Sequence, residues 1–238
     1  MPKACILGTA NLGGAVISAL SEDKWDVSGV ARSDKSLAAA EQAGGHPIQG
    51  DAADPASLAQ ALSAAREKHG GLDLVVNAVS AARPTREGPF GGGPLSEAGL
   101  EDFRGWTAAV AEQAFVFLSE GTKALKAEGG GTLVQVTGGS SRRAMPGRGL
   151  WAAGAFAARA LVQAAAQELR EEHIHAALLI VDATIESPKT EAFTRGTPRE
   201  ALADQADLAR AVRYLAEQSP RAWTHELHVV PAGETWIP

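Results

Sequence analysis

The chain has 238 residues, of which 45% are hydrophobic and 21% are charged, as is ordinary for a globular protein with a sizeable core. Its net charge of -6 argues against a nucleic-acid-binding surface, and no apolar run approaches the roughly 20 residues of a membrane-spanning helix. The first residues, MPKACILGTA, lack the pattern of a signal peptide, and the single cysteine, Cys5, has no partner, so we expect a cytoplasmic protein.

Short apolar runs alternate with longer helical patterns along the chain. The sequence predicts strands over residues 4–8, 25–31, 46–51, 72–79, 132–138, 173–183 and 225–231. It predicts helices over residues 12–20, 34–44, 55–70, 100–129, 149–169 and 204–218. Such alternation indicates a parallel sheet with helices on both faces. We therefore expect an α/β protein with one doubly wound parallel sheet, a Rossmann fold of about seven strands, in a single domain over residues 1–238.

The turn after the first predicted strand, GTANLGG (residues 8–14), has the composition of a dinucleotide-binding turn. Such a turn directs backbone N–H groups at a pyrophosphate beside a helix N-terminus. Gly8 can make the turn, and Asn11 tolerates the left-handed conformation that glycine otherwise supplies. Gly13 and Gly14 allow the helix and the strand to pack closely. The glycines alone are a weak signal, which their place between a strand and an apolar helix strengthens.

The ends of the second and third predicted strands carry residues that would select the cofactor. Folds that select NAD keep an acid at the end of the second strand, whereas an arginine accommodates the 2′-phosphate of NADP. Arg32 and Ser33 stand there with no acid before Asp34, which favours NADP(H) over NAD(H), unless Arg32 is simply a solvated residue that starts a helix. Asp51, beside Ala52, can accept a hydrogen bond from the adenine amino group, or it can cap a turn.

One long irregular segment, residues 80–97, is rich in glycine and proline. It follows the end of a predicted strand, where ligands bind in sheets of this kind. A plain surface loop of this length would be unusual, so the alternatives are a rim or lid of the ligand site and an ordinary loop.

Taken together, these motifs resemble those of the short-chain dehydrogenase/reductase family from end to end. GTANLGG resembles the family's TGxxxGxG turn, with Leu12 where the family has its middle glycine. GDAAD (50–54), LDLVVNAVS (72–80) and GGGTLVQVTGGSS (129–141) resemble its DV-x-D segment, its LDVLVNNAG and the strand that ends in its catalytic serine. The resemblance implies a nicotinamide cofactor bound by Gly8, Asn11, Leu12, Gly14, Arg32, Ser33, Asp51, Ala52, Asn77 and Ile185.

The catalytic residues that the resemblance implies are missing. The family has a Tyr-x-x-x-Lys pair on the helix after the fifth strand, in which the lysine lowers the pKa of the phenol so that the phenol can exchange a proton with the substrate. Trp151 and Ala155 stand at these positions, and Gly138 stands at the serine position. The family's asparagine position falls within residues 110–112, which contain none. The catalytic candidates that remain are Thr137, Ser140 and Trp151, with Ser141 as a further hydroxyl.

Other polar residues lie near the expected nicotinamide pocket. Arg142 and Arg143 are candidates for binding an anionic substrate or one end of the cofactor, or they are solvated loop residues. Glu112 and Asp182, the latter where the family has a proline, are candidate general acids if burial raises their pKa. The six histidines have only loose metal-ligand spacing, so we expect no metal site.

Three hypotheses follow from these residues. The first is an NADP(H)-binding protein of oxidoreductase descent with a degenerate active site and without the standard hydride transfer. The alternative is an active NADP(H)-dependent oxidoreductase that acts on an unknown small carbonyl substrate through a non-standard proton donor. The third is a scaffold in which Leu12 blocks the pyrophosphate.

The alanine-rich helix over residues 149–169 predicts how the chain associates. Its small residues allow another helix to approach closely, and members of the family associate through this helix and the long helix before it. We expect a homodimer or homotetramer assembled on residues 100–129 and 150–172, and otherwise only a packing role for the helix. The other expected partner is a small-molecule ligand in the nicotinamide cleft, with neither nucleic acid nor membrane.

Overall fold

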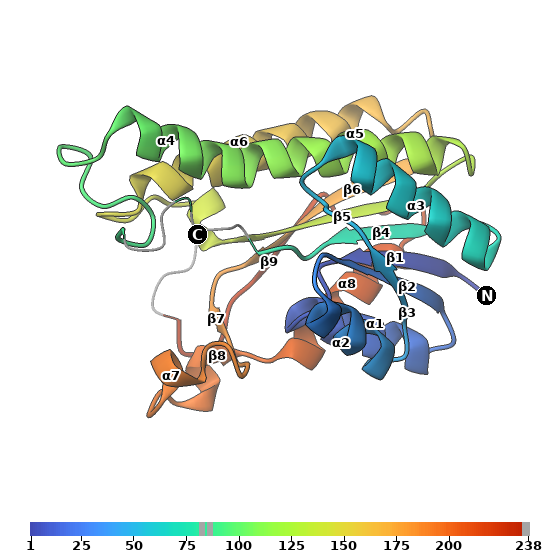
Figure 1. Cartoon of the computed structure of the whole chain (residues 1–238), viewed down its shortest axis with the longest axis horizontal. Helices are drawn as coiled ribbons and strands as arrows, with labels where there is room; N and C mark the ends of the chain where they lie inside the picture. Colours follow the sequence, from blue (N-terminus) through green and yellow to red (C-terminus); the bar gives the residue numbers. More distant parts are fainter. Residues whose placement is uncertain (81–83, 85–87, 235–238) are drawn as a thin grey trace.

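The computed structural model describes residues 1–80, 84 and 88–234, and these residues build one parallel seven-stranded sheet (Figure 1). The strand order is β3-β2-β1-β4-β5-β6-β9, and every neighbouring pair is parallel. The strands are β1 (Lys3–Leu7), β2 (Asp26–Ala31), β3 (His46–Gln49), β4 (Leu74–Asn77), β5 (Gly131–Gly138), β6 (Ile174–Val181) and β9 (Glu226–Val229). The predicted doubly wound sheet is confirmed.

Helices cover both faces of the sheet (Figure 1). One core cluster joins residues of α3, α5 and α6 to one face, and a second cluster joins residues of α1, α2 and α8 to the other. The helices are α1 (Leu12–Glu22), α2 (Asp34–Gln42), α3 (Pro55–His69), α4 (Leu100–Thr107), α5 (Gln113–Lys126), α6 (Gly149–Glu168) and α8 (Gln205–Ala216). No helix among the described residues is long and apolar enough to cross a membrane.

Strand β1 shows why the chain folds in this way. Successive side chains of a strand point to opposite faces, so Cys5 and Leu7 enter one core cluster while Ala4 and Ile6 enter the other. All four are fully buried, which is the pattern of a central parallel strand. Burial raises the pKa of the Cys5 thiol to about 12, so this thiol stays protonated at neutral pH.

The long helix predicted over residues 100–129 is not continuous. A π-helical turn (Ala108–Glu112) separates α4 from α5. Helix α6 passes very close to this turn at Gly154, where an added Cβ would lie 2.9 Å from the Cβ of Val110. Such turns are frequent at functional sites, and this one borders the cleft described below.

A small outlying unit, residues 184–203, was missed from the sequence. It contains β7 (Thr184–Ile185), α7 (Glu191–Thr194) and β8 (Leu202–Ala203), and β7 pairs with β8. Two-residue strands are too short to leave a periodic pattern. In Figure 1 this unit stands away from the main sheet, below the ends of β5 and β6.

Candidate functional site

An open cleft of about 450 Å³ lies at the carboxyl ends of the first four strands. Its walls include residues 8–11, 30–33, 50–53 and 78–80, which follow or end β1, β2, β3 and β4. Ser36, Gln113, residues of the π-helical turn and Lys189 complete the described lining. Such a crevice is where open α/β sheets bind their ligands. Of the residues predicted for the cofactor, the lining contains Gly8, Asn11, Arg32, Ser33, Asp51 and Ala52.

The turn between β1 and α1 is shaped by close packing. Gly8 has a φ of 82°, and a Cβ on Gly13 would lie only 1.7 Å from the carbonyl oxygen of Gly8. Asn11 has the predicted positive φ, 51°, but its ψ of -116° lies outside the left-handed helical region. Its side chain makes no cap hydrogen bond, and the first turn of α1 contains no acid. The start of α1 is therefore electrically suited to an anion.

Arg32, an exposed arginine, lines the end of the cleft beside β2. Nη1 of Arg32 lies 3.5 Å from Oδ2 of Asp51, and the Arg32 side chain is 70% exposed, so the pair is loose. Asp51 also caps a turn, because its Oδ1 accepts a hydrogen bond from the backbone N–H of Ala53 at 2.9 Å. Ser33 is the N-cap of α2 and accepts a hydrogen bond from the N–H of Ser36. Arginine, hydroxyl groups and a helix start thus lie together at this wall.

Four residues predicted for the cofactor lie outside the described lining. Leu12 is 5% exposed and packs in the core cluster of α1, so its side chain does not enter the cleft. Gly14 packs against Thr9, whose carbonyl oxygen would lie 2.9 Å from an added Cβ. Ile185 pairs with β8 and packs against the core. Asn77, the fourth, is fully buried beneath the cleft.

Asn77 belongs to a buried amide network that was not predicted. Its Nδ2 donates to Oε1 of Gln113 at 2.9 Å and to Oε1 of Gln135 at 2.8 Å. Its Oδ1 accepts from Nε2 of Gln113 at 3.0 Å and from the N–H of Val79 at 3.3 Å. The only sequence signal was the two glutamines in otherwise apolar elements. The network ties β4, β5 and α5 together and positions Val79 on the cleft wall.

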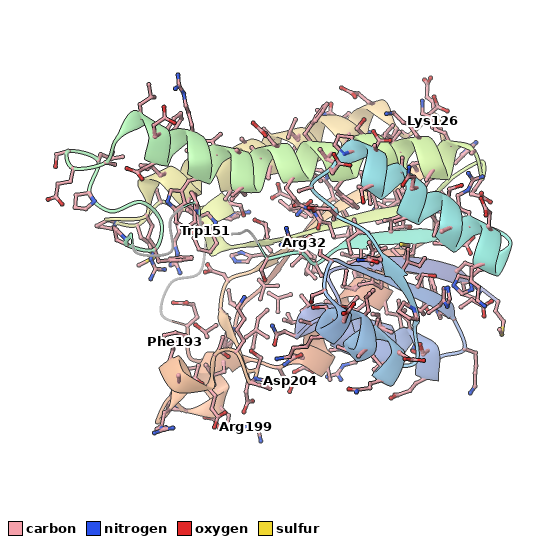
Figure 2. The ribbon with its side chains drawn as sticks, viewed as in Figure 1. Arg32, Lys126, Trp151, Phe193, Arg199 and Asp204 are labelled. Carbon is pink, nitrogen blue, oxygen red and sulfur yellow. The ribbon has the colours of Figure 1, made fainter. Side chains whose placement is uncertain are left out.

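Trp151, for which the resemblance predicts the family's tyrosine position, is labelled in Figure 2. Its ring lies in an aromatic cluster with Phe90 and Trp106. The Trp151 ring stacks on Trp106 at 5.8 Å between centroids and meets Phe90 edge-on at 3.9 Å. Phe90 belongs to the predicted lid segment, and the guanidinium of Arg148 lies 5.5 Å from its ring centroid. Ala155, for which the resemblance predicts the lysine position, is fully buried. The three rings thus pack together where the start of α6 meets the end of α4.

The segment that carries Phe90 is fastened to the start of α6. The N–H of Trp151 donates to the carbonyl of Gly91 at 3.4 Å, and the N–H of Gly93 donates to the carbonyl of Gly147 at 3.0 Å. An added Cβ on Gly92 would lie 2.5 Å from Cδ2 of Leu150, so only glycine fits there. The described part of the predicted lid therefore packs on the start of α6, and the described cleft lining contains only Ser80 of it. Its residues 81–83 and 85–87 lie outside the described residues.

The remaining hydroxyl candidates do not line the cleft. Ser141 is fully buried, and its Oγ donates to the carbonyl of Gly138 at 2.9 Å. Thr137 and Ser140 are half-buried. Among the predicted general acids, Glu112 lines the cleft from the π-helical turn but is exposed, so it lacks the burial on which its prediction depended. Asp182 is buried and lies elsewhere. Glu112 and Asp51 are therefore the acids that the described lining presents.

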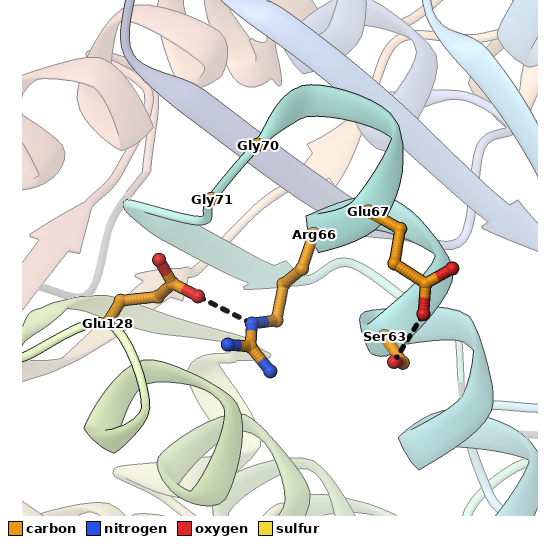
Figure 3. A pocket seen from close by; sticks show the side chains of 6 residues that line it. All are labelled: Ser63, Arg66, Glu67, Gly70, Gly71 and Glu128. Atoms are coloured by element: carbon orange, nitrogen blue, oxygen red, sulfur yellow. Dashed lines mark hydrogen bonds and ion pairs between the residues drawn. The ribbon is translucent and has the colours of Figure 1, made fainter.

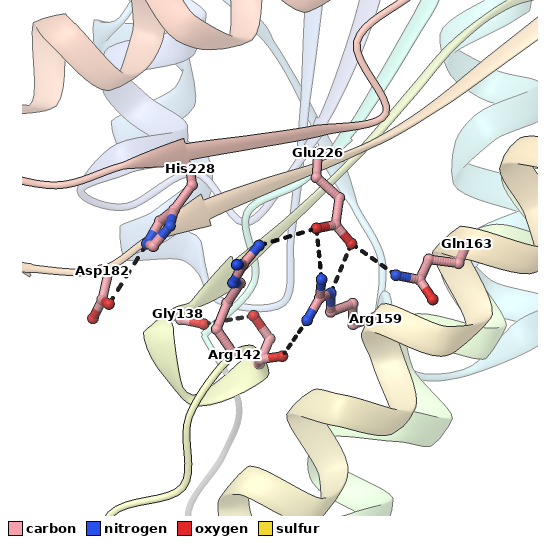
Figure 4. Close-up of polar contacts among 8 residues, drawn as sticks. Gly138, Arg142, Arg159, Gln163, Asp182, Glu226 and His228 are labelled. Carbon is pink, nitrogen blue, oxygen red and sulfur yellow. Dashed lines mark hydrogen bonds and ion pairs between the residues drawn. The ribbon is translucent and has the colours of Figure 1, made fainter. Parts of the chain in front are cut away.

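Asp182 is part of a buried polar cluster at the ends of β5, β6 and β9 (Figure 4). Its Oδ1 lies 3.2 Å from Nη2 of Arg143, and its Oδ2 lies 3.5 Å from Nε2 of His228. A Cβ on Gly139 would lie 1.9 Å from Oδ1 of Asp182, so the carboxylate needs glycine there. His228 joins this cluster because β9 runs beside β6 and ends with it.

Glu226 pairs with Arg142, the other arginine predicted near the pocket, in the same region (Figure 4). Arg159 donates to both of its carboxylate oxygens, at 2.7 and 2.8 Å, and Arg142 lies 3.4 Å away. Burial by itself raises the pKa of the Glu226 carboxyl, but hydrogen bonds from Arg159 and Gln163 outweigh it and hold the pKa below its ordinary value. Arg142 and Arg143 are thus paired with acids.

A second hollow, of about 330 Å³, lies at the opposite edge of the sheet, where α3 ends before β4 (Figure 3). Nε of Arg66 lies 2.6 Å from Oε1 of Glu128, so its one arginine is neutralised. No backbone turn of the nucleotide-binding kind borders it. Across the described parts of the chain, no group of three or more His, Cys, Asp or Glu side chains is placed to hold a metal ion.

Comparison with known families gives one match over most of the chain. The model of the family described as enoyl-(acyl carrier protein) reductase matches residues 8–235. No curated protein sequence matches the chain.

Solved structures of similar fold are numerous. A short-chain dehydrogenase from Rhodopseudomonas palustris is 24% identical with a TM-score of 0.75, over 97% of this chain and 98% of that one. An alcohol dehydrogenase from Thermococcus sibiricus, complexed with 5-hydroxy-NADP, is 23% identical with a TM-score of 0.78, over 100% of both chains. An actinorhodin polyketide ketoreductase variant with NADPH is 17% identical with a TM-score of 0.82, over 99% of this chain and 98% of that one. These similarities show the fold, and the last two proteins carry nicotinamide cofactors.

Proposed function

Because the chain belongs to the short-chain dehydrogenase/reductase family, we propose that it is an NADP(H)-binding protein of oxidoreductase descent with a degenerate active site. The observation that carries this proposal is the aromatic cluster of Phe90, Trp106 and Trp151 beside the buried Ala155. An indole N–H donates a hydrogen bond but does not titrate near neutral pH, and a methyl group can do neither. The family's standard proton relay therefore has no counterpart at these positions.

The cleft fits the adenosine and phosphate parts of the cofactor. Gly8 and Asn11 belong to the turn that faces a pyrophosphate in dinucleotide folds, and α1 begins there without a side-chain cap. Arg32 and Ser33 stand where a 2′-phosphate would be bound, and Asp51 stands where the adenine amino group would donate. A bound reduced nicotinamide would be a hydride source. These residues would hold and orient the cofactor without moving a proton.

Arg32→Ala should weaken NADPH binding about tenfold or more, because a hydrogen bond to a charged phosphate is among the stronger contacts. NADH, which lacks the 2′-phosphate, should lose little affinity. Calorimetric titration of both cofactors measures the two effects. Arg210→Ala is a matched control, since the Arg210 side chain is 71% exposed on α8 and lies outside the cleft lining. Equal losses for NADPH and NADH on Arg32→Ala would contradict the proposed selectivity.

A second candidate function is an active NADP(H)-dependent oxidoreductase with a non-standard proton donor. The observation in its favour is Glu112, a carboxyl group on the cleft wall within a π-helical turn. It belongs to residues 110–112, where the resemblance predicts the family's asparagine. Hydride transfer to a small, intrinsically reactive carbonyl compound needs only a cofactor and one polarising group. The activity assay in the Discussion separates the two functions.

We further propose that the protein is a homodimer or homotetramer assembled on α4, α5 and α6. Phe103, Phe115 and Phe156 lie on these helices with 43%, 58% and 42% of their surface exposed. Light scattering at micromolar concentration should give at least twice the monomer mass, and Phe115→Glu should lower it. Phe193→Glu is the control, because Phe193 is exposed on the outlying unit instead (Figure 2). A wild-type monomer would count against the proposal.

A further inference from the structure

Lys189 is the member of the cleft lining that comes from the outlying unit of residues 184–203. It is exposed, and the ion pairs formed by the described residues do not include it. The other cation of the lining, Arg32, is partly offset by Asp51 at 3.5 Å. Lys189 is thus a second cation of the lining, and no ion pair among the described residues offsets its charge.

The turn that presents Lys189 is built by hydrogen bonds. Thr190 is at its centre: its Oγ1 donates to the carbonyl of Ile185 at 2.6 Å and accepts from the N–H of Ser187 at 3.0 Å. The N–H of Thr190 donates to the carbonyl of Ser187 at 3.0 Å and closes a four-residue turn around Pro188 and Lys189. Proline fixes its own φ, so the sequence Ser-Pro-Lys-Thr favours this turn.

The turn is also fastened to the body of the protein. The N–H of Glu186 donates to the carbonyl of Ala203 in β8 at 2.9 Å. Nε2 of Gln205, in the first turn of α8, donates to the carbonyl of Glu186 at 2.6 Å. Since α8 packs against α1, Lys189 is held from the same scaffold that carries the start of α1. Its backbone is therefore organised before a ligand arrives, and only its side chain has to be ordered.

We propose that Lys189 binds the pyrophosphate of the dinucleotide, as a side-chain cation that complements the backbone N–H groups of the β1–α1 turn. The inference rests on the proposed function, since it requires a dinucleotide in this cleft. A pyrophosphate carries two negative charges, and the start of α1 supplies only partial positive charge. Arg32 is assigned to the 2′-phosphate, on the side of the adenosine away from the diphosphate. Lys189 is then the remaining cation of the described lining that can neutralise the diphosphate.

The test uses three ligands that differ in phosphate content: NADPH, NADH and 2′-AMP, which carries the 2′-phosphate without a pyrophosphate. Lys189→Gln should weaken NADPH and NADH binding equally, by about 5- to 20-fold, and should leave 2′-AMP binding within about twofold. Lys189→Arg should retain most of the affinity. Arg32→Ala should give the reverse pattern, with losses for NADPH and 2′-AMP. Lys126→Gln, far from the cleft on α5, is the control for removing one charge (Figure 2).

The outcomes separate this inference from the function on which it rests. If wild type binds NADPH and Lys189→Gln binds it equally well, the role of Lys189 is wrong and the proposed function stands. If Lys189→Gln loses 2′-AMP as strongly as NADPH, Lys189 acts at the 2′-phosphate and the inference is again wrong. If wild type binds none of the three ligands, the proposed function itself fails. Because Lys189 is exposed, neither Lys189→Gln nor Lys189→Arg should alter folding. An unchanged unfolding curve of each variant verifies this.

Discussion

Reduction of ketones, aldehydes and quinones with NADPH should be negligible by the family's mechanism, with rates about 10²–10⁴-fold below those that general acid catalysis gives. That factor corresponds to roughly 3–5 kcal/mol of activation free energy. The physical reason is that, in the proposed function, Trp151 and Ala155 stand where an exchangeable proton and a cation are required. Trp151 is instead packed against Phe90 and Trp106, and Ala155 is fully buried. A reactive quinone could still accept a hydride slowly through proximity alone.

The measurement is a substrate panel assayed by NADPH consumption, with protein-free reactions as the control. Turnover at ordinary rates, on the order of 1–10³ s⁻¹, would show that another residue supplies the proton. Glu112→Gln would then be the first variant to assay, because Glu112 lines the cleft. Asp182→Asn would be the second. A rate that falls with Glu112→Gln alone would establish the second candidate function.

Restoring the family residues should not restore the reaction. In the variant Gly138→Ser/Trp151→Tyr/Ala155→Lys, the new lysine replaces a fully buried methyl group, and burial of an unpaired ammonium group lowers its pKa and destabilises the fold. The new tyrosine would stand beside Phe90 and Trp106. Gly138→Ser alone should be tolerated, since an added Cβ has no neighbour nearer than 3.8 Å. Activity gained by the triple variant would show that the aromatic cluster opens readily.

The sheet could be predicted from the sequence because each strand is a short apolar run followed by a longer helical pattern. The same reasoning identified the ends of β1, β2 and β3, where Gly8, Arg32 and Asp51 line the cleft. It did not predict the directions of side chains that depend on packing. Asn77 ends β4 as predicted, but the polar partners of its amide lie on β5 and α5, so the amide turns into the core.

The missed features depend on contacts between distant segments. The aromatic cluster brings Phe90 and Trp106 to Trp151 from two other elements, and no local pattern encodes that meeting. His228 meets Asp182 only because β9 pairs with β6, and this neighbour relation is not expressed in either strand. Lys189 reaches the cleft through a unit whose strands are two residues long. The alternation of strand and helix patterns predicts the layers of the fold. These sites depend instead on tertiary contacts between segments that are distant in the sequence.

Gly13→Ala should destabilise the protein by about 3 kcal/mol or more and abolish dinucleotide binding, the largest effect expected of one methyl group here. The added Cβ would lie 1.7 Å from the carbonyl oxygen and 2.8 Å from the carbonyl carbon of Gly8, which are backbone atoms without a rotamer to change. Alanine's better helix propensity opposes this by only about 1 kcal/mol. Relief requires α1 to move away from β1, and that movement opens the turn which carries Gly8 and Asn11 on the cleft wall.

The free energy of unfolding in urea measures the first effect, and NADPH titration of the folded fraction measures the second. Gly138→Ala is the matched control, because its Cβ would meet nothing nearer than 3.8 Å. Gly14→Ala should fall between the two, since its Cβ would lie 2.9 Å from the carbonyl oxygen of Thr9. A Gly13→Ala protein that unfolds at the wild-type midpoint would mean that α1 can shift without cost. If Gly13→Ala unfolds at the wild-type urea midpoint but no longer binds NADPH, Gly13 matters only for the shape of the turn. In that case the cleft depends on the close approach of Gly13 to Gly8, whereas the stability of the core does not.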